Sequence, residues 1–287
     1  MAINHRSFGA ILRVYTKDPE LVSARAEQAV EAAINLAKIA VDGKKFFKRI
    51  DILVAADPDF IDCDCGKTAK VVRARLHGRD DDEIIFTTEV KHGDLFCGLL
   101  NYGVAHQVRT AKIDYSCVVS PEAVSYATAR VMKDILKAAL DHAKVIDVAF
   151  GELSPSIHEG RLANTFCFWH NESLQTVGGF DLQASALEKD DRQAVYLRGW
   201  KKDEGDVFYA RSGVEEIIPL VKLIKEYGKC LAVVEADQGE WKIPDPKVDP
   251  VAYDRHCKKM GTKLERQSAF AFAVGADLSY LKGGLMK

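Results

Sequence analysis

Residues 93–122 read GDLFCGLLNYGVAHQVRTAKIDYSCVVSPE. The first part carries apolar residues at helical spacing, so we predict a short helix that Asn101-Tyr102-Gly103 interrupts or loosens. Residues 115–119 then form an apolar, β-branched run, which predicts a strand buried on both faces and ending at Ser120-Pro121-Glu122. The helical spacing is carried by Leu95, Leu99, Leu100, Val104 and Ala105.

The end of this predicted strand is a candidate site. Ligands of open α/β sheets bind outside the carboxyl ends of the strands, so Ser120 and Glu122 lie where a ligand is expected if the strand is central. The same residues also form a good N-cap, N1 and N2 sequence for a helix. Glu122 is therefore either a site carboxylate or only a charge in the first turn of a helix.

Length and composition indicate one large soluble domain. The chain has 287 residues, 47% of them hydrophobic and 29% charged, and its net charge of −2 gives no sign of general nucleic-acid binding. Because no apolar run approaches a membrane span and the N-terminus lacks a signal-peptide core, we expect no membrane span and a cytoplasmic location.

The seven scattered cysteines fit a reducing compartment. Cys63-Asp64-Cys65 lacks the second close pair of ligands typical of a structural zinc site, so we interpret these cysteines as ordinary thiols.

The order of predicted elements indicates an α/β fold with a mostly parallel central sheet flanked by helices. A strand, a helix and a second strand within residues 8–56 imply a right-handed parallel crossover. We expect one domain over residues 1–287, an insertion at 182–212 and a C-terminal extension at 236–287. Further strands are predicted at 83–87, 145–150, 164–169 and 230–234, and further helices at 124–142, from 171, at 214–227 and at 253–266.

Three separated segments resemble the nucleotide-diphospho-sugar (GT-A fold) glycosyltransferases of the family 2 type. The strand and loop at 12–16 and the strand ending at Asp57 follow the order of that family's first elements. Leu100-Asn101-Tyr102-Gly103 and the strand after it are similar to the family's A-L-N-x-G helix and following strand. The most specific similarity is residues 164–181, which end in the V-G-G-F-D motif at 177–181. The resemblance covers roughly residues 8 to 235.

This resemblance implies a GT-A fold and an enzyme that transfers sugar from a nucleotide sugar to an unidentified acceptor hydroxyl. The residues implied in binding the nucleotide sugar are Thr16, Asp57, Asn101, Ser120 and Glu122. Those implied near the acceptor are Trp169, Gly179 and Asp181.

An acidic pair, Glu215-Glu216, matches the place of the family's acidic pair before a helix that ends at Gly228. Either carboxylate is a candidate catalytic base, because a base must accept the proton of the acceptor hydroxyl and the helix N-terminus favours an ionised carboxylate. The alternative is that the pair only complements the helix dipole.

The position of the family's Asp-x-Asp motif reads Ser120-Pro121-Glu122 here. In the family, these aspartates hold the divalent metal that neutralises the leaving diphosphate, and oxygen ligands suit Mn²⁺ or Mg²⁺. Glu122 is the candidate metal ligand that remains. The altered motif supports an alternative function, a catalytically impaired GT-A-fold protein that binds a nucleotide or a partner. A sugar nucleotidyltransferase is less favoured, because residues 16–19 lack the Gly-rich loop of that class.

Overall fold

The computed structural model describes residues 6–14, 22–55, 67–78, 83–90, 97–149, 162, 165–181, 215–236, 246–247, 250, 253–254, 257, 263–273 and 275–286. The insertion predicted at 182–212 and the Cys63-Asp64-Cys65 sequence lie outside these residues. Among the described residues, Cys97, Cys117, Cys167 and Cys230 are buried free thiols and Cys257 is an exposed one.

A seven-stranded sheet forms the centre of the fold, with strand order β5-β4-β1-β6-β8-β7-β9. Neighbouring strands pair in parallel except at β8, which is antiparallel to both β6 and β7. The mostly parallel sheet predicted from the sequence is therefore confirmed, and the predicted strand 115–119 is its central strand, buried at every residue. The bounds are β1 Phe8–Val14, β4 Phe47–Ala55, β5 Ile85–Val90, β6 Tyr115–Val119, β7 Val145–Ala149, β8 Phe166–His170 and β9 Leu231–Glu235.

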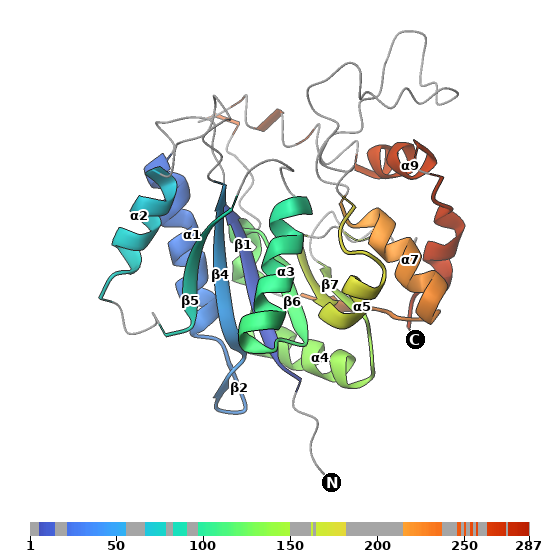
Figure 1. Cartoon of the computed structure of the whole chain (residues 1–287), viewed down its shortest axis with the longest axis horizontal. Coiled ribbons are helices and arrows are strands. Elements are labelled where there is room, and N and C mark those ends of the chain that lie inside the picture. Colours follow the sequence, from blue (N-terminus) through green and yellow to red (C-terminus); the bar gives the residue numbers. More distant parts are fainter. Residues whose placement is uncertain are drawn as a thin grey trace.

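Helices cover both faces of the sheet, and Figure 1 shows α1 and α3 on opposite sides of it. Alternate residues of β1 belong to different cores, because successive side chains of a strand point to opposite faces: Leu12 packs with α1 and Ile11 with α3. The first face carries α1 Val22–Ala37, α2 Lys67–Leu76, η2 Pro121–Tyr126 and α4 Ala129–Leu140. The second carries α3 Cys97–Ala111, α5 Asn171–Thr176, α7 Ile217–Tyr227, α9 Lys263–Ala273 and η4 Leu278–Gly283.

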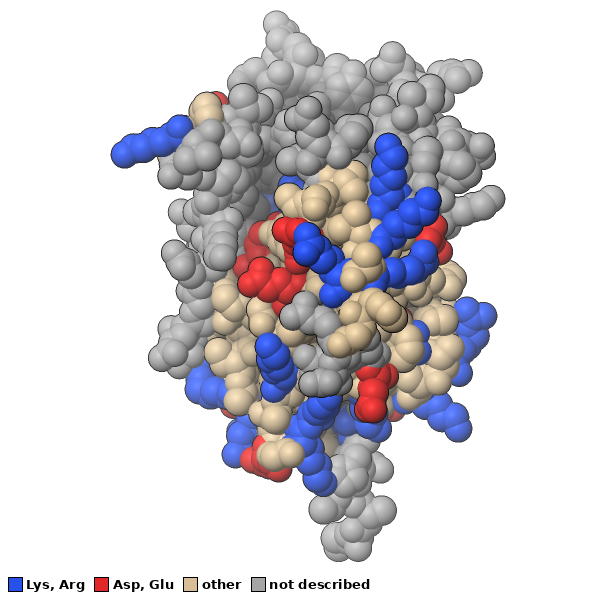
Figure 2. Space-filling view, turned by 90° about the vertical axis from the view of Figure 1, so that its left-hand side faces the viewer, with Lys and Arg blue, Asp and Glu red and all other residues tan. Residues whose placement is uncertain are grey.

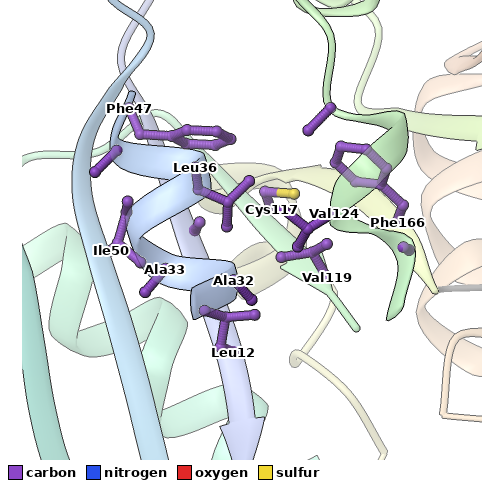
Figure 3. Close-up of a cluster of buried hydrophobic side chains, with 14 of the residues drawn as sticks. Leu12, Ala32, Ala33, Leu36, Phe47, Ile50, Cys117, Val119, Val124 and Phe166 are labelled. Atoms are coloured by element: carbon purple, nitrogen blue, oxygen red, sulfur yellow. The ribbon is translucent and has the colours of Figure 1, made fainter. Parts of the chain in front are cut away.

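The core of the first face is built on the alanine-rich helix α1. Its small side chains Ala32 and Ala33 lie against the sheet beside Leu36, and Figure 3 shows them with Leu12 and Phe47 from β1 and β4. Short side chains let the helix backbone approach the strands closely, while the larger aromatic residues fill the remaining space. Helix α1 thus connects β1 to β4, which pair in parallel, so the predicted parallel crossover is confirmed.

Helix α3 corrects one prediction, because it runs without interruption from Cys97 to Ala111. The predicted break at Asn101-Tyr102-Gly103 is wrong. A Cβ at Gly103 would lie 2.8 Å from Leu53 Cδ1 and 2.9 Å from Ile11 Cδ1, so glycine lets the helix pack directly on β4 and β1. Packing of this apolar face outweighs the roughly 1 kcal/mol by which glycine disfavours a helix relative to alanine.

Other boundaries differ where caps or packing decide them. The helix predicted at 124–142 is divided into η2 and α4, and Thr128 caps α4 by accepting a hydrogen bond from the Val131 backbone N–H. Helix α9 continues to Ala273, well past the predicted end at Arg266. The strand predicted at 83–87 begins at Ile85 and ends at Val90. A two-residue hairpin pairs β2 Ala40–Val41 with β3 Lys44–Lys45.

The described residues after 262 pack on the second face. Leu285 forms a parallel bridge with Leu231 of β9, and the Cys230 backbone N–H donates to the Gly284 carbonyl over 2.9 Å. Gly284 lies so close to Ile224 of α7 that a side chain would not fit there. This segment therefore covers α7 and the edge of β9.

The opposite edge of the sheet is formed by β5 with α2 beside it. Figure 2 shows this side of the molecule, where Lys and Arg side chains lie among Asp and Glu side chains. Arg73 of α2 pairs with Glu89 of β5 at 2.6 Å, and Arg75 pairs with Glu27 of α1. In the part of the chain that the structure describes, no helix combines the length and the apolar character needed to cross a membrane.

Candidate active site

The strand order places a topological switch point between β1 and β6. The chain runs outward from β1 to β4 and β5, then returns through α3 to β6 on the other side of β1. Ligands of open α/β sheets bind at such a point, outside the carboxyl ends of the strands. The pairing of β1 with β6 ends at Ile11 and Val118, and Arg13 follows two residues later at the carboxyl end of β1.

Glu215 lies at this edge, in ion-pair contact with β1. The Arg13 Nη1–H donates to Glu215 Oε1 over 3.1 Å, and the two side chains are 18% and 5% exposed. The acidic pair immediately precedes α7, whose first residue is Ile217. Its position therefore joins the start of α7 to the carboxyl end of β1, across 202 residues of sequence.

Glu216 is fully buried and is held from a third segment, α9. The Gln267 Nε2–H donates to Glu216 Oε1 over 2.7 Å, and Lys263 Nζ lies 3.2 Å from the same oxygen. Burial, opposed by the Lys263 charge and assisted by the neighbouring Glu215, raises the pKa of Glu216 above its usual value. We call Arg13, Glu215, Glu216, Lys263 and Gln267 the acidic-pair cluster.

Two more side chains of the sheet are part of this electrostatic environment. Asp147 of β7 is 1% exposed and is paired in register with Cys167 of β8. Burial is the largest cause that raises the pKa of Cys167, and the charges of Asp147 and Glu216 add to it. Acidic side chains from β7 and from the start of α7 thus both act on the buried Cys167.

Two of the segments that resemble the glycosyltransferases contact each other. The Asn101 Nδ2–H donates to the Phe180 carbonyl over 2.8 Å, and the Phe180 N–H donates to Asn101 Oδ1 over 2.8 Å. Gly179 has a φ of +75°, and a Cβ there would lie 2.5 Å from Asn101 Oδ1. Glycine is therefore required twice, for its backbone conformation and for the close approach of the amide.

The residues predicted near the acceptor lie around this contact. Trp169 of β8 is fully buried, with its ring edge-on to Phe180 at a centroid distance of 5.1 Å. Its side chain packs against Phe180 and so supports the turn at 177–181. Asp181 directly follows the turn and is partly exposed.

At the end of β6, Ser120 and Glu122 form the start of η2. Ser120 occupies the N-cap position without a side-chain capping bond, and Pro121 begins the helix. Glu122 lies in the first turn, with Oε1 3.7 Å from Arg25 Nη1 and 3.4 Å from Gln28 Nε2. Both partners belong to α1, so Glu122 connects η2 to the first face of the sheet. Thr16 and Asp57, the other residues predicted to bind the nucleotide sugar, lie outside the described residues.

Sequence reasoning missed the partners of the acidic pair. Arg13 carried a signal, because it is a charged residue in the otherwise apolar strand FGAILRV. Lys263 and Gln267 carried no such signal, since their contact with Glu216 depends on how α9 packs.

Sequence reasoning also missed a buried network on α3. Gln107 Nε2 donates to Asp51 Oδ2 over 2.8 Å and to the Ala10 carbonyl over 2.9 Å.

Comparison with known proteins gives structural similarities only: no family model and no curated protein matches the chain. A mannosyltransferase from Pyrobaculum calidifontis, in complex with GDP-Man and Mn²⁺, is 12% identical, with a TM-score of 0.46 over 95% of this chain and 75% of that one. A cytidylyltransferase from Leptospira borgpetersenii serovar Hardjo-bovis is 7% identical, with a TM-score of 0.45 over 99% of this chain and 100% of that one. A 4-diphosphocytidyl-2C-methyl-D-erythritol synthase from Anaerococcus prevotii is 9% identical, with a TM-score of 0.41 over 88% of this chain and 98% of that one. At these values, no ligand or residue role is transferred from them to this chain.

Proposed function

We propose that the protein is a GT-A-type glycosyltransferase, similar to family 2, that binds a nucleotide-diphosphate sugar outside the carboxyl ends of β1 and β6 and transfers the sugar to an acceptor hydroxyl. A reducing, cytoplasmic location is part of this proposal, supported by the four buried free thiols. The donor site would use Asn101 and Ser120 with Thr16 and Asp57. The acceptor side would include Gly179, Asp181 and the supporting Trp169.

The observation that carries the proposal is the contact between the acidic pair and the carboxyl end of β1, at the switch point of the sheet. Glu215 reaches Arg13 over 3.1 Å, although nothing in the local sequence joins the two. In the proposed reaction, Glu215 or Glu216 accepts the acceptor hydroxyl proton as the hydroxyl oxygen bonds to the anomeric carbon. The bond from that carbon to the diphosphate oxygen breaks at the same time, and the diphosphate leaves with the bonding electrons. Arg13 supplies positive charge at the carboxyl end of β1, where the proposed site places the leaving diphosphate.

A divalent metal does not fit the described residues at the end of β6. Mg²⁺ and Mn²⁺ are held by several oxygen ligands, and Ser120 and Glu122 offer one carboxylate that already faces the Arg25 guanidinium. Within the described ranges, no group of three or more His, Cys, Asp or Glu side chains is arranged to hold a metal ion. We therefore route no step through a metal, and Glu122 stays a proposed ligand only if residues outside the described ranges complete its site.

A second candidate function is a catalytically impaired GT-A-fold protein that binds a nucleotide or a partner. It is favoured by the ion pairs of the acidic-pair cluster, because Glu215 and Glu216 are both buried and both engaged by a cation. Such pairs hold segments together without chemistry, and they perturb pKa values as catalytic groups do. Binding without turnover is the expected behaviour of this alternative.

Nucleotide binding is the first test. We expect nucleoside diphosphates or their sugars to raise the melting temperature, because a ligand at a hundred times its dissociation constant stabilises the folded state by about 2.7 kcal/mol. Screening the common nucleoside diphosphates and their hexose derivatives identifies the base and the sugar. Absence of any shift across the panel would contradict the glycosyltransferase and would leave, of the second candidate, only a protein that binds a partner.

Turnover separates the two candidates. We expect Glu215→Gln or Glu216→Gln to abolish sugar transfer or donor hydrolysis while the thermal shift from the nucleotide is retained. Glu226→Gln is the matched control, because Glu226 is an exposed glutamate on the same helix α7. Binding by the wild type with no release of nucleoside diphosphate, even with an acceptor panel, supports the impaired protein instead.

A further inference from the structure

We infer that α9 is part of the catalytic site, with Lys263 and Gln267 as positioning residues that fix one oxygen of Glu216 and leave Oε2 to accept the proton of the acceptor. This inference rests on the proposed function and deepens it. It selects Glu216 as the base, and it gives a positioning role to α9, which lies in the C-terminal extension predicted from the sequence.

The first step of the argument is that α9 holds Glu216 through two side chains of one helix face. Lys263 and Gln267 are four residues apart, so they project from the same side of α9. Both reach Glu216 Oε1, at 3.2 Å and 2.7 Å. Gln267 is also anchored, because its Nε2 donates to the Leu162 carbonyl over 3.1 Å. The carboxylate is thus held by a fixed amide and a cation, which leaves its plane little freedom to turn.

The second step is that only one oxygen of the Glu216 carboxylate, Oε1, has polar partners among the described residues. Glu216 Oε2 is buried and accepts no hydrogen bond from the described residues, and Gln267 Oε1 is buried without a donor in the same way. Nearly all buried polar atoms in folded proteins have partners, so two acceptors without donors, on side chains that contact each other, require an explanation. A ligand hydroxyl is a donor that satisfies such acceptors, and the acceptor substrate of the proposed reaction carries one.

The third step is that the charges around Glu216 set whether it is ionised. Burial and Glu215 favour the protonated form, whereas Lys263 favours the ionised form. Among the described residues, Arg13 on β1, bound to Glu215, and Cys167 and Asp147 on the sheet also face this region. Lys263 Nζ lies 3.2 Å from Glu216 Oε1, so its charge opposes the effect of burial and favours the ionised form that a base requires.

The experiment measures the titration of Glu216 directly by carboxyl ¹³C NMR, assigned by difference from Glu216→Gln. We expect Lys263→Met to raise the pKa of Glu216 by about one to three units, because an opposite charge at this distance has an effect of that size. Lys263→Arg should restore the wild-type titration. Lys282→Met is the matched control, since Lys282 is an exposed lysine on η4. An unchanged titration in Lys263→Met would overturn the inference.

Kinetics with the donor found by nucleotide screening gives a second readout. The acidic limb of the pH profile of kcat should move upward in Lys263→Met by the same amount as the NMR titration. Gln267→Met removes the hydrogen bond with a side chain of similar volume, and we expect kcat to fall by about 10²-fold with KM for the donor little changed. If Lys263→Met does not fold, the kinetics of Gln267→Met test the inference alone, and a wild-type kcat in that variant would overturn it. A shifted titration without sugar transfer in any variant would instead refute the proposed function.

Discussion

Asn101 on α3 and Phe180 in the turn after α5 are 79 residues apart, and the amide of Asn101 makes two hydrogen bonds of 2.8 Å to the Phe180 backbone. One side chain therefore satisfies a backbone donor and a backbone acceptor of a turn that has no regular structure. This contact brings together two of the segments that resemble the glycosyltransferases, L-N-Y-G and V-G-G-F-D. It explains why asparagine and glycine occur at these places whatever ligand the neighbouring site binds.

We expect Asn101→Ala to lower the free energy of unfolding by about 1–3 kcal/mol, because the buried backbone groups of Phe180 lose their partners. Gly179→Ala should be destabilising both through its positive φ and through the clash with Asn101 Oδ1. Gly178 also has a positive φ but has open space around it, so Gly178→Ala measures the backbone effect alone.

A double-mutant cycle in chemical denaturation separates the clash from the backbone strain. In the Asn101→Ala background, Gly179→Ala should cost no more than Gly178→Ala does in the wild type, since the clashing oxygen is gone. Additive effects of Asn101→Ala and Gly179→Ala would show that the close approach does not restrict position 179.

The sequence was sufficient where local pattern and packing agree. The run Tyr115–Val119 reads as a buried strand and is one, and Gly228 ends α7 as its position predicts. It was misleading at Gly103, where propensity indicates a break but the glycine serves contact between α3 and the sheet. It was silent on Lys263 and Gln267, because contact between α9 and Glu216 arises only when segments far apart in the chain pack together. The antiparallel direction of β8 was likewise not encoded in any local pattern.

The ion pair between Arg49 and Asp51 on β4 is a buried structural feature away from the proposed site. Arg49 Nε and Nη2 donate to the Asp51 carboxylate at 2.8–2.9 Å, and Asp51 is fully buried. We expect Asp51→Asn to destabilise the protein by about 3–5 kcal/mol, because it leaves a guanidinium charge buried without its counter-ion.

Replacing the arginine as well should recover part of that loss. The double variant Arg49→Met/Asp51→Asn is therefore expected to unfold at a higher urea concentration than Asp51→Asn alone. A double variant less stable than Asp51→Asn would show that the guanidinium stabilises the sheet independently of Asp51, for example through its stacking on Phe86 at 4.0 Å.

The altered sequence at the end of β6 predicts nucleotide binding that does not depend on a metal. Glu122 faces Arg25 at 3.7 Å, so its charge is already partly compensated. We expect the thermal shift produced by a nucleoside diphosphate to be equal in Mn²⁺ and in EDTA, and Glu122→Gln to leave it unchanged. A shift that EDTA removes, and that Glu122→Gln removes in the same way, would establish Glu122 as a metal ligand and refute this prediction.

His170 gives the protein a stability that depends on pH. Its Nδ1 accepts a hydrogen bond from the Ser173 backbone N–H at the start of α5 and lies 2.8 Å from Ser173 Oγ. Burial, with the charges of Lys144 and Arg6, lowers the pKa of His170 from 6.5 to about 4. The unfolded chain therefore binds a proton at higher pH than the folded chain, so the contribution is fully present above pH 6.5 and is lost as the pH falls towards 4. The loss is up to about 3 kcal/mol in the free energy of unfolding.

Comparison of the wild type with His170→Asn isolates this effect from other groups that titrate in acid. Asparagine is a good N-cap residue and has no charge change, so the variant should keep the start of α5. We expect the difference in unfolding free energy between the two proteins to change by about 3 kcal/mol between pH 7 and pH 4, with the wild type losing more. Parallel pH profiles would mean that His170 titrates alike in the folded and unfolded chain, and its neutral form would then have no role in holding α5.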